Sequence, residues 1–480
     1  MLVENAGYLP GLNANDIDRQ AQLYGPEGNK ITVLLPVLED KQATKLVTHV
    51  REQACLRLKS RPLGQILDII DITISRLLDR QDPYRRRMEE LLPIVTGYDR
   101  EMVRLGLTSY LKTFRKPQLQ RFLSEDFMNP AILDSFQPLP KGGLGRAFGP
   151  KILTHVWSGN VPGIPLWSLV AGLLVKAGNI GKIPTVEPIF ASLFSQLFAE
   201  VAPELADCLA IVWWKGGSEA IETTVFNESD MVLGYGQNES LAAIQNLIPI
   251  TKRFLAYGNK FSLAMVSAEA LNVSKVCTTA RLLAYDVARY DQQGCYAPQM
   301  VFVEREGSVS PERFAQYLAH ELAVFEEKFP LRPLSLAEAN KIICWRNNEE
   351  MTPGGKVFFA ETGSWAVSYQ ADGKFSSPSC LNRTIRVVGI DDLMQAPNFL
   401  APYSAHLQTV GVAASPEALV TLASALGEVG VTRIAAIGDM TSPEAGWHHD
   451  GRFNLLDLVK ITEIDGRAED AAEQFAYYDV

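Results

Sequence analysis

Cys295 is the residue whose type and setting most clearly suggest chemistry, in the stretch "YDQQGCYAPQMVFVE" that runs from Tyr290 to Glu304. Gly294 and a polar run precede the thiol and an apolar run follows it, so the cysteine occupies a turn just ahead of a predicted strand. A free cysteine is usually a small buried hydrophobic residue, and we keep that interpretation for the remaining cysteines. The polar turn instead favours a reactive thiol at Cys295. Such a thiol ionises only where positive potential, from backbone N–H groups or a helix N-terminus, stabilises the thiolate.

The stretch "GWHHDGRFNLLDLV" contains a second group of chemically capable residues, His448, His449 and Asp450. Adjacent histidines point in different directions in a regular element, and no third ligand stands at a spacing typical of a metal site. We therefore expect no metal here, and we interpret the stretch as a loop that lines the mouth of an active site.

The elements that would position these residues follow from the apolar pattern. Short runs such as "KILTHVWSG", "CLAIVWWKGG" and "DMVLGYG" alternate with helical stretches of ten or more residues, which predicts a parallel sheet covered on both faces. Three strands run into Gly216, Gly234 and Gly258. Because ligands bind beyond the carboxyl ends of such strands, the pattern predicts a nucleotide-binding lobe, although the sequence contains no GxGxxG fingerprint.

A second alternating block contains Cys295 near its start and could face the first block across a cleft. We therefore predict an α/β protein with two Rossmann-like lobes, parallel sheets and an active site between them. The expected division is a helical N-terminal part (1–145) packed on a nucleotide-binding lobe (146–260), then a catalytic lobe (261–440), then a C-terminal segment with an acidic tail (441–480).

Composition narrows the classes of function. A net charge of -10 over 480 residues argues against nucleic acid as the main partner. The most apolar stretch, "VPGIPLWSLVAGLLVKAGNI", is interrupted by prolines and too short to predict a membrane span. The N-terminus has no pattern of a secretory signal, and the scattered cysteines suit a reducing cytoplasm, where we expect the protein to lie.

Several segments, in matching order, resemble the aldehyde dehydrogenase superfamily. The segment "YDQQGCYAPQMVFV" is most similar to the nucleophile segment of LuxC-type long-chain fatty-acyl-CoA reductases. The segment "HVWSGNVPGIPLWSLVAGLLVKAGNIGKIPTVEPIF" resembles the one that carries the oxyanion asparagine and the cofactor lysine. "FLAYGNKFSLAMV" resembles the one that carries Glu-Leu-Gly-Gly-Lys in oxidative members. The resemblance spans roughly residues 145–465.

The resemblance implies roles for individual residues. Cys295 would be the nucleophile, and the side-chain amide of Asn160 would stabilise an oxyanion together with the Cys295 N–H. Lys182 would contact the adenosine ribose or phosphate of a nicotinamide cofactor. Gly236, Gln237 and Gly258 would let the backbone approach that cofactor. Without the resemblance, Asn160 is explained equally well as a turn asparagine and Lys182 as a solvated lysine. Gly236, Gln237 and Gly258 would then be ordinary turn residues.

Two departures from the superfamily pattern bear on the reaction. Ala256 stands where oxidative members carry a general-base glutamate, so a thioester on Cys295 should resist hydrolysis and wait for a thiol or for hydride. Thr185 stands where NAD-preferring members carry a glutamate, which favours NADPH, although Glu187 follows closely and the turn could place it differently.

These inferences predict an NADPH-dependent reductase that converts a long-chain acyl-CoA to the fatty aldehyde through an acyl group on Cys295. An acylating or oxidative aldehyde dehydrogenase, and an acyl-transfer protein without redox chemistry, remain alternatives. The expected partners are acyl-CoA or an acyl-carrier protein as substrate, an acyl-activating ligase, and further copies of the chain in a homo-oligomer. Neither nucleic acid nor a membrane span is expected.

Overall fold

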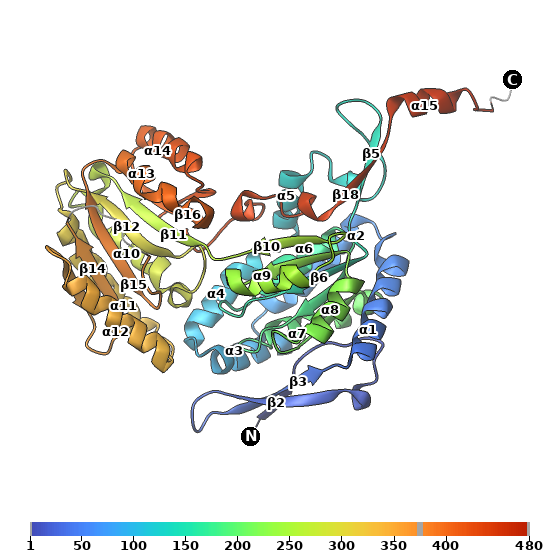
Figure 1. Ribbon diagram of the computed structural model, residues 1–480, viewed down its shortest axis with the longest axis horizontal. Helices are drawn as coiled ribbons and strands as arrows, with labels where there is room; N and C mark the ends of the chain where they lie inside the picture. Colours follow the sequence, from blue (N-terminus) through green and yellow to red (C-terminus); the bar gives the residue numbers. More distant parts are fainter. Residues whose placement is uncertain (1, 372–377, 478–480) are drawn as a thin grey trace.

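Two α/β bodies dominate the computed structural model, which describes residues 2–371 and 378–477 (Figure 1). Each body is built around a sheet of mainly parallel strands, as the alternating apolar pattern predicts. No helix in the part of the chain that the structure describes is long and apolar enough to cross a membrane.

The five-stranded sheet is wholly parallel and has the strand order β10-β9-β6-β7-β8. The chain builds it outward from β6 through β7 to β8, and then crosses to the other side of β6 to add β9 and β10. The order therefore reverses between β6 and β9, and ligands bind in α/β sheets at such a switch point. Its strands are β6 (Ile152–Val156), β7 (Gly178–Lys182), β8 (Leu209–Val212), β9 (Met231–Tyr235) and β10 (Arg253–Tyr257). Its helices are α6 (Ile164–Leu174), α7 (Phe190–Val201), α8 (Glu219–Glu228) and α9 (Asn238–Leu247).

The seven-stranded sheet has the order β13-β14-β15-β12-β11-β16-β17, and only β13 runs antiparallel to its neighbour. Two near-continuous apolar strands, β11 and β12, lie at its centre and are almost wholly buried, as expected of strands covered on both faces. Its strands are β11 (Phe261–Val266), β12 (Pro298–Glu304), β13 (Lys356–Phe359), β14 (Ala366–Gln370), β15 (Thr384–Ile390), β16 (Leu407–Ala413) and β17 (Arg433–Ala436). Its helices are α10 (Val276–Ala288), α11 (Pro311–Lys328), α12 (Leu336–Glu350), α13 (Ala396–Leu400) and α14 (Pro416–Glu428).

The N-terminal part is not wholly helical, contrary to the expectation from sequence. Its first residues form a three-stranded sheet of β1 (Leu2–Asn5), β2 (Asp18–Tyr24) and β3 (Ile31–Val37), in the order β1-β3-β2. The run "ITVLLPV" of β3 is rich in β-formers, and Val33 and Leu35 are fully buried. Five helices follow: α1 (Asp40–Gln53), α2 (Leu63–Leu78), α3 (Pro83–Thr96), α4 (Arg100–Lys112) and α5 (Lys116–Asp126).

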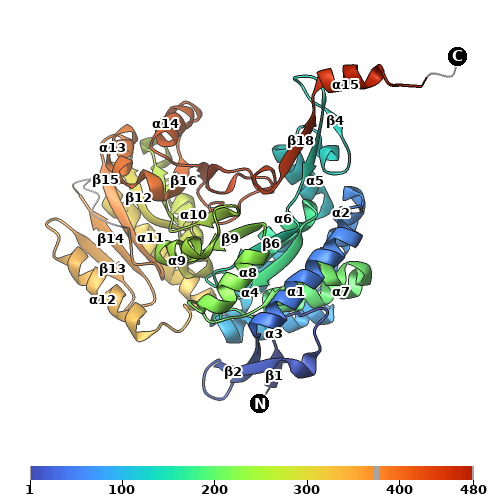
Figure 2. The same ribbon diagram turned by 45° about the vertical axis from the view of Figure 1, so that its right-hand side comes forward.

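The C-terminal residues return to the N-terminal half of the chain. Strand β18 (Lys460–Ile464) pairs antiparallel with β5 (Leu144–Phe148), which also pairs with the short β4 (Gln137–Pro138). This small sheet and the exposed helix α15 (Gly466–Glu473) project from the body of the molecule (Figure 2). The acidic tail thus continues from a paired strand, and its helix has no buried residue.

Candidate active site

Cys295 lies at the N-terminal edge of the seven-stranded sheet, just ahead of β12, and is partly exposed. The turn that leads to it is unusual, because Tyr290, Asp291 and Gln292 all have left-handed backbone conformations, with φ of 48°, 50° and 67°. Such conformations cost a residue with a side chain roughly 1–2 kcal/mol each. At Gly294 a Cβ atom would lie 2.4 Å from the ring of Tyr296, so the glycine before the nucleophile meets a packing requirement.

A second left-handed turn holds the first in place. Leu381, Asn382 and Arg383 have φ of 64°, 55° and 64°, and side chains join the two turns. Arg383 is fully buried; its Nε donates to Asp291 Oδ1 at 2.9 Å and its Nη1 donates to Glu326 Oε2 at 2.6 Å. We call these two turns and the bonds between them the double turn (290–293 and 381–384).

Amide side chains complete the double turn. Gln292 Nε2 donates to the carbonyl oxygens of Thr384 and Pro298, at 2.9 and 2.6 Å, and its Oε1 accepts from Thr384 N–H at 3.1 Å. Gln293 Nε2 donates to Asn382 Oδ1 at 2.9 Å. The side chain of Gln292 thus bonds to two backbone segments as the backbone of a strand would. A buried hydrogen-bonded network of this kind makes a segment rigid.

Asn160 connects the nucleophile turn with the five-stranded sheet. It follows β6, and its Nδ2 donates to the carbonyl oxygen of Gln293 at 2.7 Å, two residues before Cys295. Its Oδ1 accepts from Ser158 Oγ at 2.7 Å, and its carbonyl oxygen accepts from the Tyr98 hydroxyl at 2.6 Å. The structure thus brings together the two residues predicted to act on the acyl group. A primary amide has two N–H donors, so the bond to Gln293 leaves one for an oxyanion.

The Cys295 thiol is neutral at neutral pH. Burial raises its pKa to about 11, and the nearby Asp450 carboxylate raises it further, whereas a hydrogen bond from Gln408 and the N–H groups of Cys295 and Tyr296 act in the opposite direction. The backbone N–H groups expected from the sequence are therefore present, but burial outweighs them. Ser262 Oγ fixes the backbone here by donating to the Cys295 carbonyl oxygen at 2.7 Å.

The loop with the paired histidines packs against the ends of β10 and β16. The His449 ring stacks on Tyr257, the last residue of β10, with ring centres 4.6 Å apart, and lies 5.0 Å from the Trp447 ring. Asp450 Oδ1 accepts from Gln408 Nε2 at 2.6 Å. Within residues 2–371 and 378–477, no cluster of three or more His, Cys, Asp or Glu side chains is placed to hold a metal ion.

Sequence reasoning missed Ser262, Gln408 and the partners of the double turn. Ser262 and Gln408 are each the second residue of a buried strand, β11 and β16, in the runs "FSLAMV" and "LQTVGVA". A polar residue near the start of an otherwise apolar strand was the available signal. The partners Asn382 and Arg383 lie about 90 residues from the nucleophile, so no local pattern could identify them.

The residues predicted to bind a cofactor lie at the C-terminal edge of the five-stranded sheet. Lys182 ends β7, and burial lowers its pKa although Glu222 opposes the shift. Gly236 follows β9 next to the switch point, and a Cβ atom added there would meet nothing within 4 Å, so its backbone is open to a ligand. Gln237 is the N-cap residue of α9. Glycine is required at position 258 by packing instead, because a Cβ atom there would lie 2.4 Å from Asn238 Oδ1.

Glu187 does not replace the carboxylate missing at Thr185. It is 2 % exposed, and its Oε1 accepts from the N–H groups of Ile189 and Phe190, both at 2.8 Å, at the start of α7. Burial raises its pKa to about 7 against the effect of these bonds. Thr185 itself is exposed, and its Oγ1 accepts from Trp213 Nε1 at 3.0 Å. The lysine at the end of β7 and the open glycine backbone after β9 fit a nicotinamide dinucleotide.

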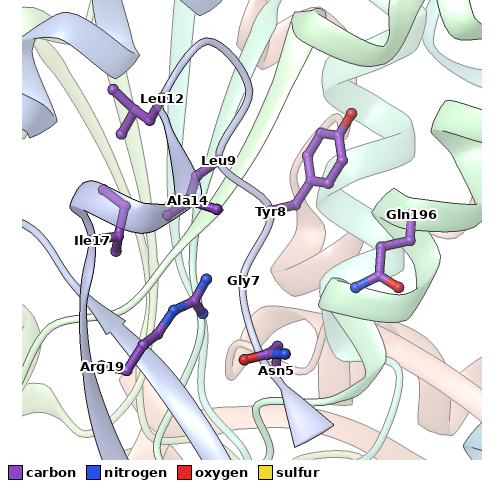
Figure 3. Close-up of a pocket in the computed structure, with 9 residues that line it drawn as sticks. All are labelled: Asn5, Gly7, Tyr8, Leu9, Leu12, Ala14, Ile17, Arg19 and Gln196. Carbon is purple, nitrogen blue, oxygen red and sulfur yellow. The ribbon is translucent and has the colours of Figure 1, made fainter.

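A separate pocket of about 490 Å³ lies between the N-terminal segment and α7 (Figure 3). Asn5, Tyr8, Arg19 and Gln196 contribute its polar side chains, and Arg19 Nη1 donates to the Ala6 carbonyl oxygen at 2.9 Å. None of the residues that line it belongs to the predicted site, so this pocket is distinct from the region around Cys295.

Residues 58–461 match the protein family described as "Acyl-CoA reductase (LuxC)". Among characterised relatives, the long-chain acyl-protein thioester reductase of Aliivibrio fischeri is 23% identical over 460 residues, which cover 93% of this chain and 90% of the relative. Long-chain acyl-protein thioester reductase 2 of Photobacterium leiognathi is 24% identical over 387 residues, covering 79% and 78% of the two chains.

Solved structures of aldehyde dehydrogenases share the fold. The indole-3-acetaldehyde dehydrogenase of P. syringae, in complex with NAD+, has a TM-score of 0.75 at 13% identity and covers 97% of each chain. The glyceraldehyde-3-phosphate dehydrogenase of Methanocaldococcus jannaschii, in complex with NADP, has a TM-score of 0.69 at 12% identity, covering 90% of this chain and 95% of that one. The predicted fold class, two α/β lobes of the aldehyde dehydrogenase type, is therefore confirmed.

Proposed function

Because the chain belongs to the acyl-CoA reductase (LuxC) family, we propose that it reduces a long-chain acyl thioester to the fatty aldehyde, with NADPH as the reductant. The observation that carries this proposal is the position of Cys295, just after the double turn and two residues beyond the carbonyl group that Asn160 binds. A nucleophile fixed against a side-chain amide is the arrangement that acyl transfer to a thiol requires.

In the proposed reaction, individual residues would have the following roles. The Cys295 sulfur attacks the acyl carbonyl carbon and expels the donor thiol, which leaves a thioester on the enzyme. The free N–H of the Asn160 amide and the Cys295 backbone N–H stabilise the oxyanion. The nicotinamide supplies hydride when it is bound. The resulting thiohemiacetal on Cys295 then collapses to aldehyde, and the sulfur regains its proton.

The missing carboxylate at Ala256 supports reduction over hydrolysis. Ala256 is an exposed residue of β10, and a side chain without a carboxylate cannot activate water against the thioester. An acyl group on Cys295 would therefore persist until hydride reaches it. This observation favours the reductase over an oxidative aldehyde dehydrogenase, the alternative that uses the same nucleophile.

The surroundings of Thr185 support NADPH as the cofactor. Two protein features distinguish NADPH from NADH at such sites, namely a carboxylate that binds the ribose hydroxyls and a cation that accepts the 2′-phosphate. The Glu187 carboxylate is turned inward to cap α7, and Lys182 ends the neighbouring strand. Lys182, Thr185, Gly236 and Gln237 are the residues that would hold the cofactor. Gly258 would lie behind them, packed on α9.

Aromatic side chains beside the nucleophile support an apolar acyl group. Tyr110 packs edge-on against Phe114 at 5.0 Å, and Phe114 packs against Trp167 at 5.9 Å. Burial raises the pKa of Tyr110, and the charge of Tyr296, the residue that follows Cys295, adds to that shift. Rings of this kind bury large apolar area, which suits a fatty acyl chain.

The donor and the assembly belong to the same proposal. The relatives are named for acyl-protein thioesters, which supports a protein-bound acyl group, supplied by an acyl-activating ligase or a carrier protein, alongside acyl-CoA. We expect a homo-oligomer, as in the superfamily that the sequence resembles. Free cysteines suit a reducing cytoplasm, where we place the reaction.

The test is a reductase assay with a long-chain acyl-CoA and NADPH, following the loss of reduced-nicotinamide absorbance and the formation of aldehyde. We expect activity in the natural protein and a loss of at least about a thousandfold in Cys295→Ala, with the protection of reduced-nicotinamide fluorescence retained. Acyl transfer to Cys295 without any oxidation of NADPH would overturn the redox step and favour the acyl-transfer alternative. Activity that survives Cys295→Ala would overturn the proposal as a whole.

A further inference from the structure

Tyr98 lies between the loop that carries Asn160 and the turn that leads to the nucleophile. It directly precedes Asp99, the N-cap residue of α4, and is 5 % exposed. Its hydroxyl donates to the Asn160 carbonyl oxygen at 2.6 Å. Its ring packs edge-on against the ring of Tyr290, with ring centres 5.6 Å apart and planes at 70°. One side chain from the N-terminal helices thus contacts both elements that are proposed to act on the acyl group.

Tyr290 attaches the nucleophile turn to helix α4. Its N–H donates to Met102 Sδ at 3.0 Å, and a Cβ atom at Gly106 would lie 2.0 Å from the Tyr290 hydroxyl oxygen. Tyr290 is 3 % exposed and belongs to the same hydrophobic core as Tyr98 and Met102. Close packing of this kind fixes where the first residue of the double turn lies. The Tyr98 ring is therefore packed on a fixed part of the nucleophile turn.

The backbone of Asn160 has far fewer contacts. Asn160 lies in the half-buried loop between β6 and α6, and its side chain is held by Ser158 and by the Gln293 carbonyl oxygen, both at 2.7 Å. Among residues 2–371 and 378–477, the Tyr98 hydroxyl is the only hydrogen-bond partner of the Asn160 backbone. The position of this backbone relative to the nucleophile turn therefore depends on Tyr98.

The Tyr98 hydroxyl is a permanent donor. Burial raises the pKa of Tyr98, and the negative charge of Asp291 raises it further, so the hydroxyl keeps its proton at neutral pH. A carbonyl group that loses a buried partner is destabilised, and its loop shifts until another partner is found. A displacement of about 1 Å in a reacting geometry can slow a reaction about a hundredfold. A hydrogen bond to the Asn160 backbone can therefore control how well its amide stabilises an oxyanion.

We propose that Tyr98 is a positioning residue for acyl transfer: its hydroxyl fixes the Asn160 backbone relative to the nucleophile turn and so orients the free N–H of the Asn160 amide toward the oxyanion. This inference rests on the proposed roles of Cys295 and Asn160. Tyr98 touches no reacting atom and acts only through Asn160. The N-terminal helices thus contribute to the reaction as well as packing on the lobe that carries the five-stranded sheet.

The test uses four variants of the full-length protein: Tyr98→Phe, Asn160→Ala, the double variant of both, and Tyr84→Phe as the matched control. Phenylalanine at position 98 keeps the ring that packs on Tyr290 and removes only the hydroxyl. Tyr84 is a half-buried tyrosine of α3 whose hydroxyl donates to Glu200 at 2.5 Å, so its change removes an equivalent group from the same N-terminal helices.

Two rates are measured in each variant. The first is the release of coenzyme A in a single turnover with a long-chain acyl-CoA, a step that passes through an oxyanion. The second is the alkylation of Cys295 by iodoacetamide, read by mass spectrometry of its peptide, a step that forms no oxyanion. A residue that only supports the fold of the nucleophile turn would change both rates.

In Tyr98→Phe we expect the release of coenzyme A to slow about tenfold, with the alkylation of Cys295 unchanged. In the double variant we expect no further slowing beyond that of Asn160→Ala, because no amide remains for the hydroxyl to position, and residues that act through one another are not additive. Tyr84→Phe should change neither rate.

Three results would overturn the inference. Unchanged release of coenzyme A in Tyr98→Phe would remove its basis. An equal slowing by Tyr98→Phe in the Asn160→Ala background would show that the hydroxyl acts independently of Asn160. A parallel fall in alkylation would make its role structural. Release of coenzyme A that survives in Cys295→Ala would instead overturn the proposed function.

Discussion

Two sheet edges meet at the proposed site: the C-terminal edge of the five-stranded sheet and the N-terminal edge of the seven-stranded sheet. They differ in how open their backbone is and in how far their charged side chains are buried. At the first edge the chain turns through Gly236 with open space around the backbone, and Lys182 supplies a positive charge. At the second edge, Asp291 and Arg383 are fully buried and the turn has three consecutive left-handed residues.

The difference shows how one fold serves two requirements. A cofactor enters and leaves in each turnover, so the edge that binds it keeps backbone groups available to solvent. A nucleophile must hold one geometry, and small misplacements of reacting groups slow a reaction greatly. The second edge therefore combines strained backbone with buried ion pairs that determine its conformation. If this comparison is right, changes at the two edges should have separable effects.

The largest separable effect should come from Arg383→Met. This change leaves Asp291 and Glu326 without their buried cation, and breaking such a pair by removing one partner costs about 3–5 kcal/mol. We expect the free energy of unfolding, measured by denaturant titration, to fall by that amount and alkylation of Cys295 to become less selective over the exposed cysteines. Arg281→Met, at an exposed position of α10, is the matched control. Equal losses in the two variants would contradict a special role for the double turn.

The next effect should come from Asn160→Ala, the change at the contact between the two edges. Removing one oxyanion donor lowers the rate of the chemical step by about 10²–10³, and the loss should appear in single-turnover reduction with the affinity for NADPH unchanged. Ser158→Ala removes only the hydroxyl that donates to Asn160 Oδ1. If Ser158→Ala slowed the step as much as Asn160→Ala, Asn160 would act by shaping its own loop.

The two edges also differ in how far the sequence predicts them. The strands of the five-stranded sheet and the glycines that end them follow from local apolar runs, and Lys182, Gly236 and Asn160 lie at or just beyond the ends of these strands. The double turn does not follow from local pattern, because the bonds that stabilise it join Asp291 and Gln292 to residues about 90 positions away. Such long-range pairs are fixed by how the strands order themselves in the sheet.

Helix α12 is a second element that its local sequence pattern does not predict well. Its run "NKIICWRNN" has mixed polarity and no clear apolar face, and only Ile342, Trp345 and Glu349 are buried. Glu349 pairs in the interior with Arg386 of β15, and Gln370 of β14 donates to it at 2.9 Å. A helix whose buried face includes a charge depends on its tertiary partner, which the periodicity of its own residues does not reveal.

Glu187 allows a test of the first edge through pH. Its pKa of about 7 in the folded protein lies above the ordinary value of 4.5, so the folded state binds more protons between these values. Its contribution to stability is fully present below about pH 4.5 and is lost as pH rises to about 7, by roughly 3 kcal/mol in total. In Glu187→Gln we expect this part of the pH dependence of unfolding to disappear, whereas Glu239→Gln, at an exposed position of α9, should keep it. An unchanged slope in Glu187→Gln would show that another group is responsible.

The smallest effect should be a change of cofactor preference in Thr185→Glu. A carboxylate at this exposed position would repel a 2′-phosphate and bind free ribose hydroxyls. We expect the ratio of kcat/KM for NADPH to that for NADH to fall about tenfold, which corresponds to about 1.4 kcal/mol, with the alkylation rate of Cys295 unchanged. Thr185→Gln, which has the same shape without the charge, should shift the ratio far less. A shift of equal size in both variants would assign the preference to the space at position 185, and a slower alkylation of Cys295 would show that the two edges are coupled.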